Sequence, residues 1–396
     1  MTGPLTGVRV LEYAQYVAGP LCGVLLADLG AEVVKLEPPT GDGYRHVMPV
    51  APGLGRYFIP LNRGKRSVVV DLKTVEGRGQ SSALLTTADS VLHNFPPARA
   101  ERFGLDWDAV HRAAPAAVVG VVSSFGPVGP LSGDPAYDLV AQARSGLLTA
   151  HAGPGDAVPV RAGGIPMADL TAGYLLASRV LAALVDARRT GLGSLVEVSL
   201  LAGAMAVQVQ DLVWLEGEEA AEARVASRAD LDARAAEITG DISMNPYYRC
   251  FAAADGFLAV ACLNIVQRRA FLGRFELDDP TVDAPDLVSS DPDVLAAKRA
   301  LTSRIEQAIS LHTVSDWLAQ LSAIGVPCAP VLVRETVAQD AQVRASGLVG
   351  EIQQPGLGRV RLLNGLGGGA GAALRPAPSL GSETAAVLSD LGAWES

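Results

Sequence analysis

The stretch GVRVLEYAQYVAGPLCGVLLADLGAEVVKLE, residues Gly7–Glu37, decides the fold class. Its two apolar ends, Gly7–Ala14 and Ala31–Glu37, each predict a short buried strand. The segment between them, Ala18–Gly30, predicts a helix with a proline in its first turn and a glycine at its stop. Such a strand–helix–strand unit implies parallel pairing of the two strands, because the crossover helix returns the chain to the end of the sheet where it began.

Similar units follow along the chain. Four more apolar runs read as buried strands: Lys65–Leu72, Ala88–Phe95, Ala116–Gly126 and Val196–Leu200. Helical stretches lie between or near these runs, and the alternation predicts a doubly wound α/β domain. The composition agrees, since only 5% of the residues are aromatic while Ala, Val, Leu and Gly abound, which suits helices packed on a parallel sheet.

The pattern changes after residue 200. A long helix near Leu201–Leu215 and a charged, Ala-rich helical linker are expected first. An Asp-Gly turn then predicts an antiparallel hairpin, and further segments complete a second, smaller domain. Its expected elements are the hairpin Tyr247–Leu263, helices near Val266–Arg274 and Ala296–Leu321, and a strand-like segment at Gly325–Val333. The tail predicts a short strand, a flexible loop and a final helix from about Ser382.

Charge and composition limit which partners and which cellular compartment we expect for this protein. The net charge of −10 and the lack of a basic block argue against nucleic acid, whose phosphates need clustered Lys and Arg. The most apolar run contains Arg179 and is followed by Asp186, so it falls short of the ~20 apolar residues of a membrane span. The N-terminus has no signal-peptide pattern. We therefore expect a cytoplasmic protein that is not bound to a membrane.

Cysteine and histidine patterns do not predict a metal site. The four widely spaced cysteines are expected to be buried thiols in a reducing cytosol: Cys22, Cys250, Cys262 and Cys328. The five histidines are isolated, and no serine lies in a G-x-S-x-G motif: His46, His93, His111, His151 and His312. The loop Gly365–Gly371 is followed by two prolines, so it cannot open a helix as a phosphate loop does, and a mobile loop or a lid is expected.

The turn after the first strand, YAQYVAGP, lies where α/β folds bind ligands, at the carboxyl end of a strand. It is not a G-x-G-x-x-G turn, so a dinucleotide site is only weakly indicated. Glu37 ends the second strand, where a ribose-binding acid often lies, and a merely solvated Glu37 is the alternative.

Asp169 stands directly before a strongly helical run that begins at Leu170. Asp is a preferred N-cap, so capping alone explains its presence. A carboxylate at a helix N-terminus also stays ionised, because the helix dipole and unpaired N–H groups stabilise its charge. An ionised carboxylate needs no general base to act as a nucleophile. Position alone leaves both roles open.

Eight stretches carry a resemblance across nearly the whole chain: GVRVLEYAQYVAGPLCGVLLADLGAEVVKLEPPTGD, LNRGKRSVVVDLKTVEGR, HNFPPARAERFGLDWD, GPVGPLSGDPAYDLVAQARSG, GIPMADLTAG, GSLVEVSLL, GVPCAPVL and PAPSLGSET. In this order they closely resemble the family III CoA-transferases, which include formyl-CoA transferase, carnitine CoA-transferase and the α-methylacyl-CoA racemases. The resemblance implies a Rossmann-like, doubly wound parallel sheet domain built from both chain ends. It also implies a smaller α+β domain and an interlocked homodimer. The expected boundaries are 1–200 for the N-terminal part of the large domain, 201–240 for the linker, 241–325 for the small domain and 326–396 for the return to the large domain.

The resemblance also implies the site. Asp169 matches the family's nucleophile, and the substrates would be an acyl-CoA and a small carboxylic acid, with no permanently bound cofactor and no metal. The positions that match CoA contacts are Val17, Ala18, Val70, Asp71, Leu72, Lys73, Asn94, Phe95, Pro96, Arg102, Ala136 and Tyr137. Lys73 and Arg102 can meet phosphate charge, although each alone also suits a solvated surface.

Three departures bear on the substrates. Val17 stands where formyl-CoA transferase has glutamine, and Pro38 replaces a basic residue, so Arg45 is expected to supply that charge. The glycine-rich lid of formyl-CoA transferase belongs to an insertion that this chain lacks. Formyl-CoA and oxalate are therefore not the expected substrates.

The residue at position 137 bears on the reaction. Tyr137 occupies the place of the racemases' histidine, and tyrosine, with a free pKa near ~10, is a poor base at neutral pH. This favours CoA transfer. Two alternatives stay open: racemisation with another proton donor, such as His93 or His151, and a non-catalytic CoA-binding protein.

Overall fold

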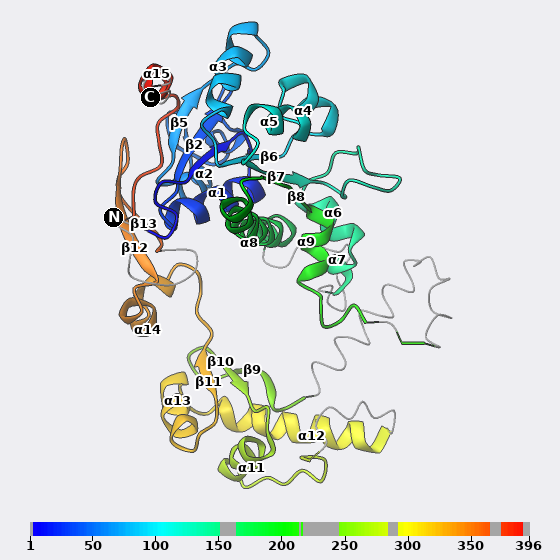
Figure 1. Ribbon diagram of the computed structural model, residues 1–396. Coiled ribbons are helices and arrows are strands. Elements are labelled where there is room, and N and C mark those ends of the chain that lie inside the picture. The colour runs from blue at the N-terminus through cyan, green and yellow to red at the C-terminus, as the bar shows by residue number, and fades with distance from the viewer. Residues whose placement is uncertain are drawn as a thin grey trace. The chain divides into compact units, whose positions relative to one another are not determined.

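The computed structural model describes residues 3–150, 164–213, 215–216, 245–283, 292–364 and 374–390. The described residues form two compact units (Figure 1). Of these residues, the larger unit contains 3–150, 164–213, 215–216, 340–364 and 374–390. The smaller unit contains 245–283 and 292–339. Both ends of the described chain therefore belong to the larger unit.

A six-stranded parallel sheet forms the centre of the larger unit. Its strands, in spatial order, are β5 (Arg66–Val69), β2 (Glu32–Glu37), β1 (Arg9–Glu12), β6 (Ser90–His93), β7 (Val118–Ser123) and β8 (Leu195–Ser199). The chain moves outward from β1 in one direction through β2 and β5, and in the other through β6, β7 and β8. This confirms the predicted doubly wound sheet and places the switch in strand order between β1 and β6, where α/β sheets bind ligands.

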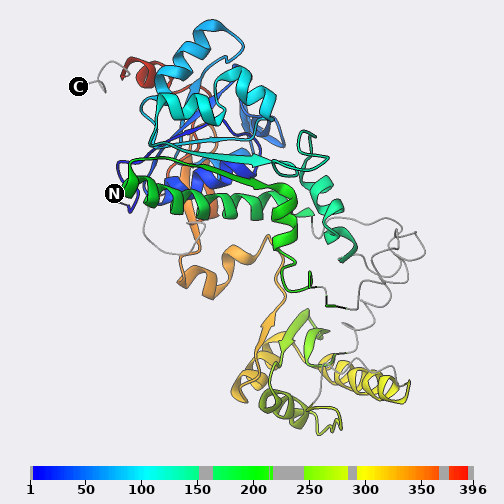
Figure 2. The ribbon, with the colours of Figure 1, turned by 45° about the vertical axis from the view of Figure 1, so that its right-hand side comes forward.

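Helices cover both faces of this sheet (Figure 2). On one face Val10 and Val33 pack with α1 (Ala18–Asp28), α8 (Met167–Thr190) and α9 (Leu200–Ala206). On the other face Leu11 and Val34 pack with α3 (Val75–Leu85), α5 (Trp107–Ala113) and α15 (Thr384–Ser389). Successive strand residues therefore point to opposite apolar layers, which explains why the strands read as continuous apolar runs.

Helix α8 packs closely against α1 at Gly173. A Cβ atom at Gly173 would lie 2.8 Å from the Ala18 carbonyl oxygen, so only glycine fits there without a shift. Asp169 lies one turn earlier on the same helix face, because residues four apart are neighbours on a helix. Asp169 therefore lies on the side of α8 that packs against α1 at Gly173.

The C-terminal segment lies along the β5 edge of the sheet. The Gly381 N–H donates to the Ser67 hydroxyl at 2.9 Å and the Glu383 N–H to the Ser67 carbonyl at 3.0 Å. The Val69 N–H donates to the Thr384 hydroxyl at 2.9 Å. The segment begins with α14 (Ala341–Ala345) and a hairpin of β12 (Val349–Gln354) and β13 (Gly358–Leu363), of which the sequence predicted only one strand.

The described residues of the smaller unit form an antiparallel sheet and the helices that pack on it. Strands β9 (Tyr248–Ala252) and β10 (Phe257–Ala261) form the predicted hairpin, and β11 (Cys328–Pro330) pairs with β10. The helices are α11 (Ile265–Arg274), α12 (Pro292–Ile309) and α13 (Val314–Ala323). Phe251, Leu258 and Trp317 lie in their shared core.

Three expectations were wrong. The helix expected to reach Leu215 ends at Ala206, because the Gln208 side chain donates to the Ala204 carbonyl, which a continuing helix would need. The single helix expected at Ala296–Leu321 is two helices, since Thr313 starts α13 with a capping box. All four cysteines are free thiols as expected, but Cys250 is exposed and Cys328 is only partly buried. The predicted linker helix and the Gly365–Gly371 loop lie outside the described residues.

The sequence analysis also missed two short strands and the length of the apolar helix α8. Strands β3 (Pro49–Ala51) and β4 (Leu54–Gly55) form a small antiparallel pair. Helix α8 is long and apolar enough to cross a membrane by length and composition alone, contrary to the expectation from its charges. Its buried residues, among them Leu176 and Val180, belong to the core beneath the sheet, as in the core helix of a globular unit.

Two valines of α8 allow a matched test of this packing. Val180 is 0% exposed and Val185 is 72% exposed. We expect Val180→Ala to lower the free energy of unfolding by about 1–3 kcal/mol, because it removes buried methyl groups and leaves a cavity. Val185→Ala should change it by less than about 0.5 kcal/mol. Urea unfolding followed by circular dichroism measures both, and equal losses would contradict the assigned packing of α8.

Candidate active site

Two turns meet at the carboxyl edge of the sheet, at the switch in strand order. The first turn, between β1 and α1, contains Gln15 and Tyr16, and the second turn begins with Asn94, just after β6. The Asn94 side chain accepts from the Gln15 N–H at 3.2 Å and donates to the Gln15 carbonyl at 3.0 Å. The two predicted ligand turns are therefore joined by paired hydrogen bonds.

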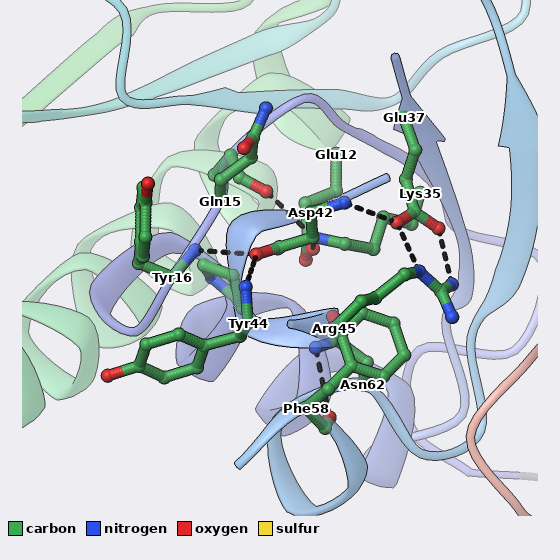
Figure 3. Close-up of polar contacts among 12 residues, drawn as sticks. Glu12, Gln15, Tyr16, Lys35, Glu37, Asp42, Tyr44, Arg45, Phe58 and Asn62 are labelled. Atoms are coloured by element: carbon green, nitrogen blue, oxygen red, sulfur yellow. Dashed lines mark hydrogen bonds and ion pairs between the residues drawn. The ribbon is translucent and has the colours of Figure 1, made fainter. Parts of the chain in front are cut away.

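Tyr16 has a left-handed backbone, with φ of 70°. This conformation is uncommon for a residue other than glycine and indicates local strain. Its N–H donates to the Asp42 carboxylate at 3.2 Å, and the same oxygen accepts from the Tyr44 N–H at 2.9 Å (Figure 3). Asp42 thus fixes the backbone of two tyrosines.

A fully buried ion network lies behind these turns. The Lys35 ammonium contacts Glu12 at 3.0 Å, Asp42 at 2.9 Å and the Ala14 carbonyl at 2.8 Å. The Lys65 ammonium reaches the second Glu12 oxygen at 2.7 Å. All four charged side chains are buried. Their mutual pairing stabilises charges that would be very costly if left alone in the interior.

The two lysines respond differently to this burial. For Lys35, burial alone would lower the pKa, but the charges of Asp42, Glu12 and Glu37 raise it above its usual value. For Lys65, burial dominates over Glu12 and lowers the pKa to about 8. Lys35 is therefore the fixed positive charge at this edge.

Glu37 and Arg45 form a second buried pair beside this network, which corrects two expectations. Arg45 donates to both carboxylate oxygens of Glu37, at 2.7 and 2.6 Å, and its guanidinium lies 3.8 Å from the centre of the Phe58 ring (Figure 3). Glu37 is 1% exposed, so it is neither a solvated acid nor placed to bind a ribose. Arg45, also 1% exposed, cannot supply a cation to a phosphate at the surface.

Asp169 is the third residue of α8, not its N-cap. The N-cap residue is Pro166, and the capping carboxylate comes from Asp138, which accepts from the N–H groups of Ala168 at 3.0 Å and Asp169 at 3.4 Å. The second oxygen of Asp138 accepts from Gln142 at 2.8 Å. The interpretation of Asp169 as the cap was wrong because the capping residue, Asp138, lies 31 positions away along the chain.

Four tyrosines, which we call the tyrosine cluster, lie beside this helix start: Tyr16, Tyr44, Tyr57 and Tyr137. The ring of Tyr16 meets those of Tyr44 and Tyr137 edge-on, with centres 5.6 and 5.9 Å apart, and Tyr57 lies 5.9 Å from Tyr44. Burial, followed by the nearby charges of Asp169 and Asp42, raises the pKa of Tyr44 to about 12. Tyr44 is therefore near Asp169 and is a protonated donor at neutral pH.

Sequence reasoning found only Tyr137 of this cluster. Tyr16 lies within the quoted first turn, but its left-handed backbone gives no local sequence signal. Tyr44 lies in a short 3-10 helix, Gly43–Arg45, and Tyr57 lies between β4 and α2 (Phe58–Asn62), where no periodicity or motif of the sequence points to them.

The other predicted contacts lie on neighbouring segments. Asn94, Phe95 and Pro96 help to line a cavity of about 240 Å³, together with Trp107 and Ser124. The Ala136 N–H donates to the Ser124 hydroxyl at 2.9 Å, next to Tyr137. The side chains of Val17, Ala18 and Val70 are buried, Asp71 and Leu72 are partly buried, and Lys73 and Arg102 are exposed. The structure thus joins the first turn, the Asn94 turn and Tyr137, and places the two cations on the surface.

His93 is buried, and its ring accepts from the Phe95 N–H at 3.3 Å. Burial lowers its pKa to about 4, so His93 is neutral at physiological pH. His151, the other histidine considered as a proton donor, lies outside the described residues. Within the described ranges, no group of three or more His, Cys, Asp or Glu side chains could hold a metal ion.

A sequence model of CoA-transferase family III matches residues 5–384. The chain belongs to this family. It is 32% identical to a probable fatty acyl-CoA transferase of Mycobacterium tuberculosis, over 82% of this chain and 81% of the relative. It is 31% identical to a succinate–glutarate CoA-transferase of Agrobacterium fabrum, over 98% of this chain and 96% of that relative. It is 30% identical to an acetyl-CoA:oxalate CoA-transferase of Acetobacter aceti, over 88% of this chain and 87% of that relative.

Solved structures agree with this membership. A CaiB/BaiF family protein from Brucella suis is 28% identical and superposes with a TM-score of 0.79, covering 99% of this chain and 100% of that one. The chain is therefore an enzyme of CoA-transferase family III, which uses CoA thioesters as substrates, and its relatives named as CoA-transferases support CoA transfer to carboxylates.

The cap of α8 generates a prediction. Asp138→Ala removes the acceptor for two N–H groups and should cost about 1–2 kcal/mol of unfolding free energy. Because the helix start also carries Asp169, we expect CoA transfer to fall by roughly tenfold or more. The control is Asp340→Ala, which removes the N-cap of α14. Thermal unfolding and initial transfer rates measure both variants, and equal rates would show that capping α8 does not affect the reaction.

The buried His93 predicts a pH effect on stability. Its pKa is about 4 in the folded protein and about 6.5 in the unfolded chain. As the pH falls below 6.5 the unfolded state takes up the proton first, so stability is lost between pH 6.5 and 4. From pH 7 to 5 this loss amounts to about 2 kcal/mol.

Urea unfolding at pH 7 and pH 5 tests this effect. His93→Asn should lose less stability over this interval than the wild type. His46→Asn, which replaces an exposed histidine, should behave as the wild type does. The same pH-dependent loss in His93→Asn and the wild type would refute the assignment.

Proposed function

We propose that Asp169 carries CoA from an acyl-CoA donor to a carboxylic acid through covalent intermediates. The observation that carries this proposal is the position of Asp169 in the first turn of α8, one turn before Gly173, which packs against Ala18 of α1. This position puts a carboxylate at the ligand-binding edge of the sheet. The family membership of the chain supplies the matching chemistry.

The proposed reaction has four steps. The Asp169 carboxylate attacks the thioester carbonyl, and the CoA thiolate leaves from the resulting tetrahedral intermediate, which gives an aspartyl–acyl anhydride. The thiolate then attacks the aspartyl carbonyl, which releases the donor acid and leaves an aspartyl-CoA thioester. The acceptor carboxylate attacks this thioester to form a second anhydride and thiolate. Attack of the thiolate on the acceptor carbonyl yields the new acyl-CoA and restores Asp169.

The oxyanion of each tetrahedral intermediate needs a hydrogen-bond donor. The N–H groups of Ala168 and Asp169 already donate to Asp138. The Tyr44 hydroxyl is the candidate that we propose, because Tyr44 belongs to the tyrosine cluster beside this helix start and is protonated at neutral pH. We therefore assign oxyanion stabilisation to Tyr44, and not to the backbone at the start of α8.

The proposal includes the substrates and the assembly. Relatives are named for succinate and glutarate, for acetyl-CoA and oxalate, and for fatty acyl-CoA, so the donor is an acyl-CoA and the acceptor a small carboxylic acid of unspecified length. CoA would lie along the first turn, the Asn94 turn and Tyr137, with Lys73 and Arg102 meeting its phosphates. From the family resemblance we also propose an interlocked homodimer in the cytoplasm.

Racemisation of an acyl-CoA is the second candidate. It requires a base for the α-proton, and Tyr137 stands at the expected place. A tyrosine hydroxyl is mostly protonated at neutral pH, which disfavours this reaction. Deuterium uptake from D₂O at the α-carbon, without CoA exchange between acids, would favour racemisation.

Asp169→Ala is the decisive variant for the nucleophile. We expect it to abolish CoA exchange between an acyl-CoA and a carboxylate, and to abolish the covalent CoA adduct that intact-protein mass spectrometry should detect in the acid-quenched wild type. Asp186→Ala, an exposed carboxylate on the same helix, is the control and should retain both. A panel of acyl-CoA donors and acceptor acids identifies the working pair. Undiminished exchange in Asp169→Ala would reject the proposed mechanism.

A further inference from the structure

We propose that Asp42 is a positioning residue for the reaction, which holds Tyr16 and Tyr44 in the places where they shape the surroundings of Asp169. This inference rests on the proposed function of Asp169. Asp42 itself is 0% exposed and lies in the loop after β2. It acts through the backbone of the two tyrosines and not by touching a substrate.

The two oxygens of Asp42 have different partners. One oxygen accepts from the N–H groups of both Tyr16 and Tyr44, at 3.2 and 2.9 Å (Figure 3). The other oxygen pairs with the Lys35 ammonium at 2.9 Å. The ion pair fixes the orientation of the carboxylate, and the carboxylate in turn fixes two segments that are far apart in sequence.

Lys35 restrains the same turn from a second point. Its ammonium donates to the Ala14 carbonyl at 2.8 Å, two residues before Tyr16. The first turn is therefore held at Ala14 by Lys35 and at Tyr16 by the Asp42 carboxylate. These contacts account for a tyrosine that keeps a left-handed backbone, with φ of 70°, which requires support from its surroundings.

The ring of Tyr16 fits closely over Gly43. A Cβ atom at Gly43 would lie 2.8 Å from three atoms of the Tyr16 side chain: Cε1, Cζ and Oη. The ring therefore lies against the backbone beside Asp42, and from there it meets Tyr44 and Tyr137 edge-on. A change at Gly43 displaces the ring without altering a buried charge.

Two carboxylates bound to Lys35 allow a matched comparison. Asp42 and Glu12 are both 0% exposed and both pair with the Lys35 ammonium, but only Asp42 binds the tyrosine N–H groups. An asparagine has one acceptor oxygen, so Asp42→Asn must leave either Lys35 or the two N–H groups without their partner. Glu12→Gln weakens the ion network and leaves those N–H bonds in place.

The experiment measures amide exchange and kinetics in the full-length enzyme. In Asp42→Asn we expect hydrogen exchange at the Tyr16 and Tyr44 amides to accelerate about tenfold or more. We expect kcat to fall by roughly tenfold with little change in the KM for the acyl-CoA, because misplacement of groups near the reacting atoms affects the transition state. Glu12→Gln should lower the melting temperature but keep both amides protected and kcat close to the wild-type value.

A second pair of variants does not depend on the ion network. Gly43→Ala should lower kcat by displacing the Tyr16 ring, with wild-type stability largely kept. Gly79→Ala, at a helical position where a Cβ meets no atom within 4 Å, is the control and should leave transfer unchanged. If Asp42→Asn does not fold, this pair decides the question.

The outcomes separate this proposal from the function on which it rests. A lower kcat in Asp42→Asn and Gly43→Ala, with active Glu12→Gln and Gly79→Ala, supports the positioning role. An active wild type in which both Asp42→Asn and Gly43→Ala keep full kcat overturns the role of Asp42 alone. A wild type without CoA transfer contradicts the proposed function, and with it any role of Asp42 in that reaction.

Discussion

The pairing of the Lys35 ammonium with Asp42 is the interaction on which the ligand edge of the sheet depends. Lys35 lies on β2, Glu12 on β1 and Asp42 in the loop that follows β2. A buried charge must keep its partners, because an unpaired one costs several kcal/mol in the interior. The positions of two strands and one loop are therefore linked. Lys65 extends this linkage through Glu12 to the residue just before β5.

At the start of α8 the capping acid and the proposed nucleophile are two different residues. Asp138 satisfies the N–H groups of Ala168 and Asp169. The helix end is thus completed by a residue from another segment, and the Asp169 side chain does not serve as the cap. A carboxylate in the first turn still gains from the helix dipole, which favours its charged form. This arrangement suits a carboxylate whose task is to attack a carbonyl.

The strands and helices of the larger unit could be predicted because their signals are local. The apolar runs that form β1, β2 and β6 are contiguous, and the Asp-Gly turn between β9 and β10 is read from two residues. The missed features depend on residues far apart in sequence. Asp138 caps a helix 30 residues away, and Ser67 binds Gly381 across 314 residues. The Glu37–Arg45 pair spans only eight residues, but no local pattern of the sequence reveals that Glu37 is buried. Its burial is what shows that Glu37 pairs with Arg45 and is not placed to bind a ribose.

The acidic surroundings of the tyrosine cluster bear on the choice of reaction. Burial raises the pKa of Tyr16, and Tyr137 and the Asp42 carboxylate add to that rise. Burial and the charges of Asp169 and Asp42 raise the pKa of Tyr44 to about 12. Each carboxylate near these rings makes loss of their protons more costly, so the two hydroxyls are stabilised as donors and disfavoured as bases. A racemase needs a group that accepts a proton near neutral pH, whereas acyl transfer needs donors that stabilise an oxyanion. The burial and charge of this edge therefore disfavour proton abstraction by Tyr16 or Tyr44, which a racemase would require.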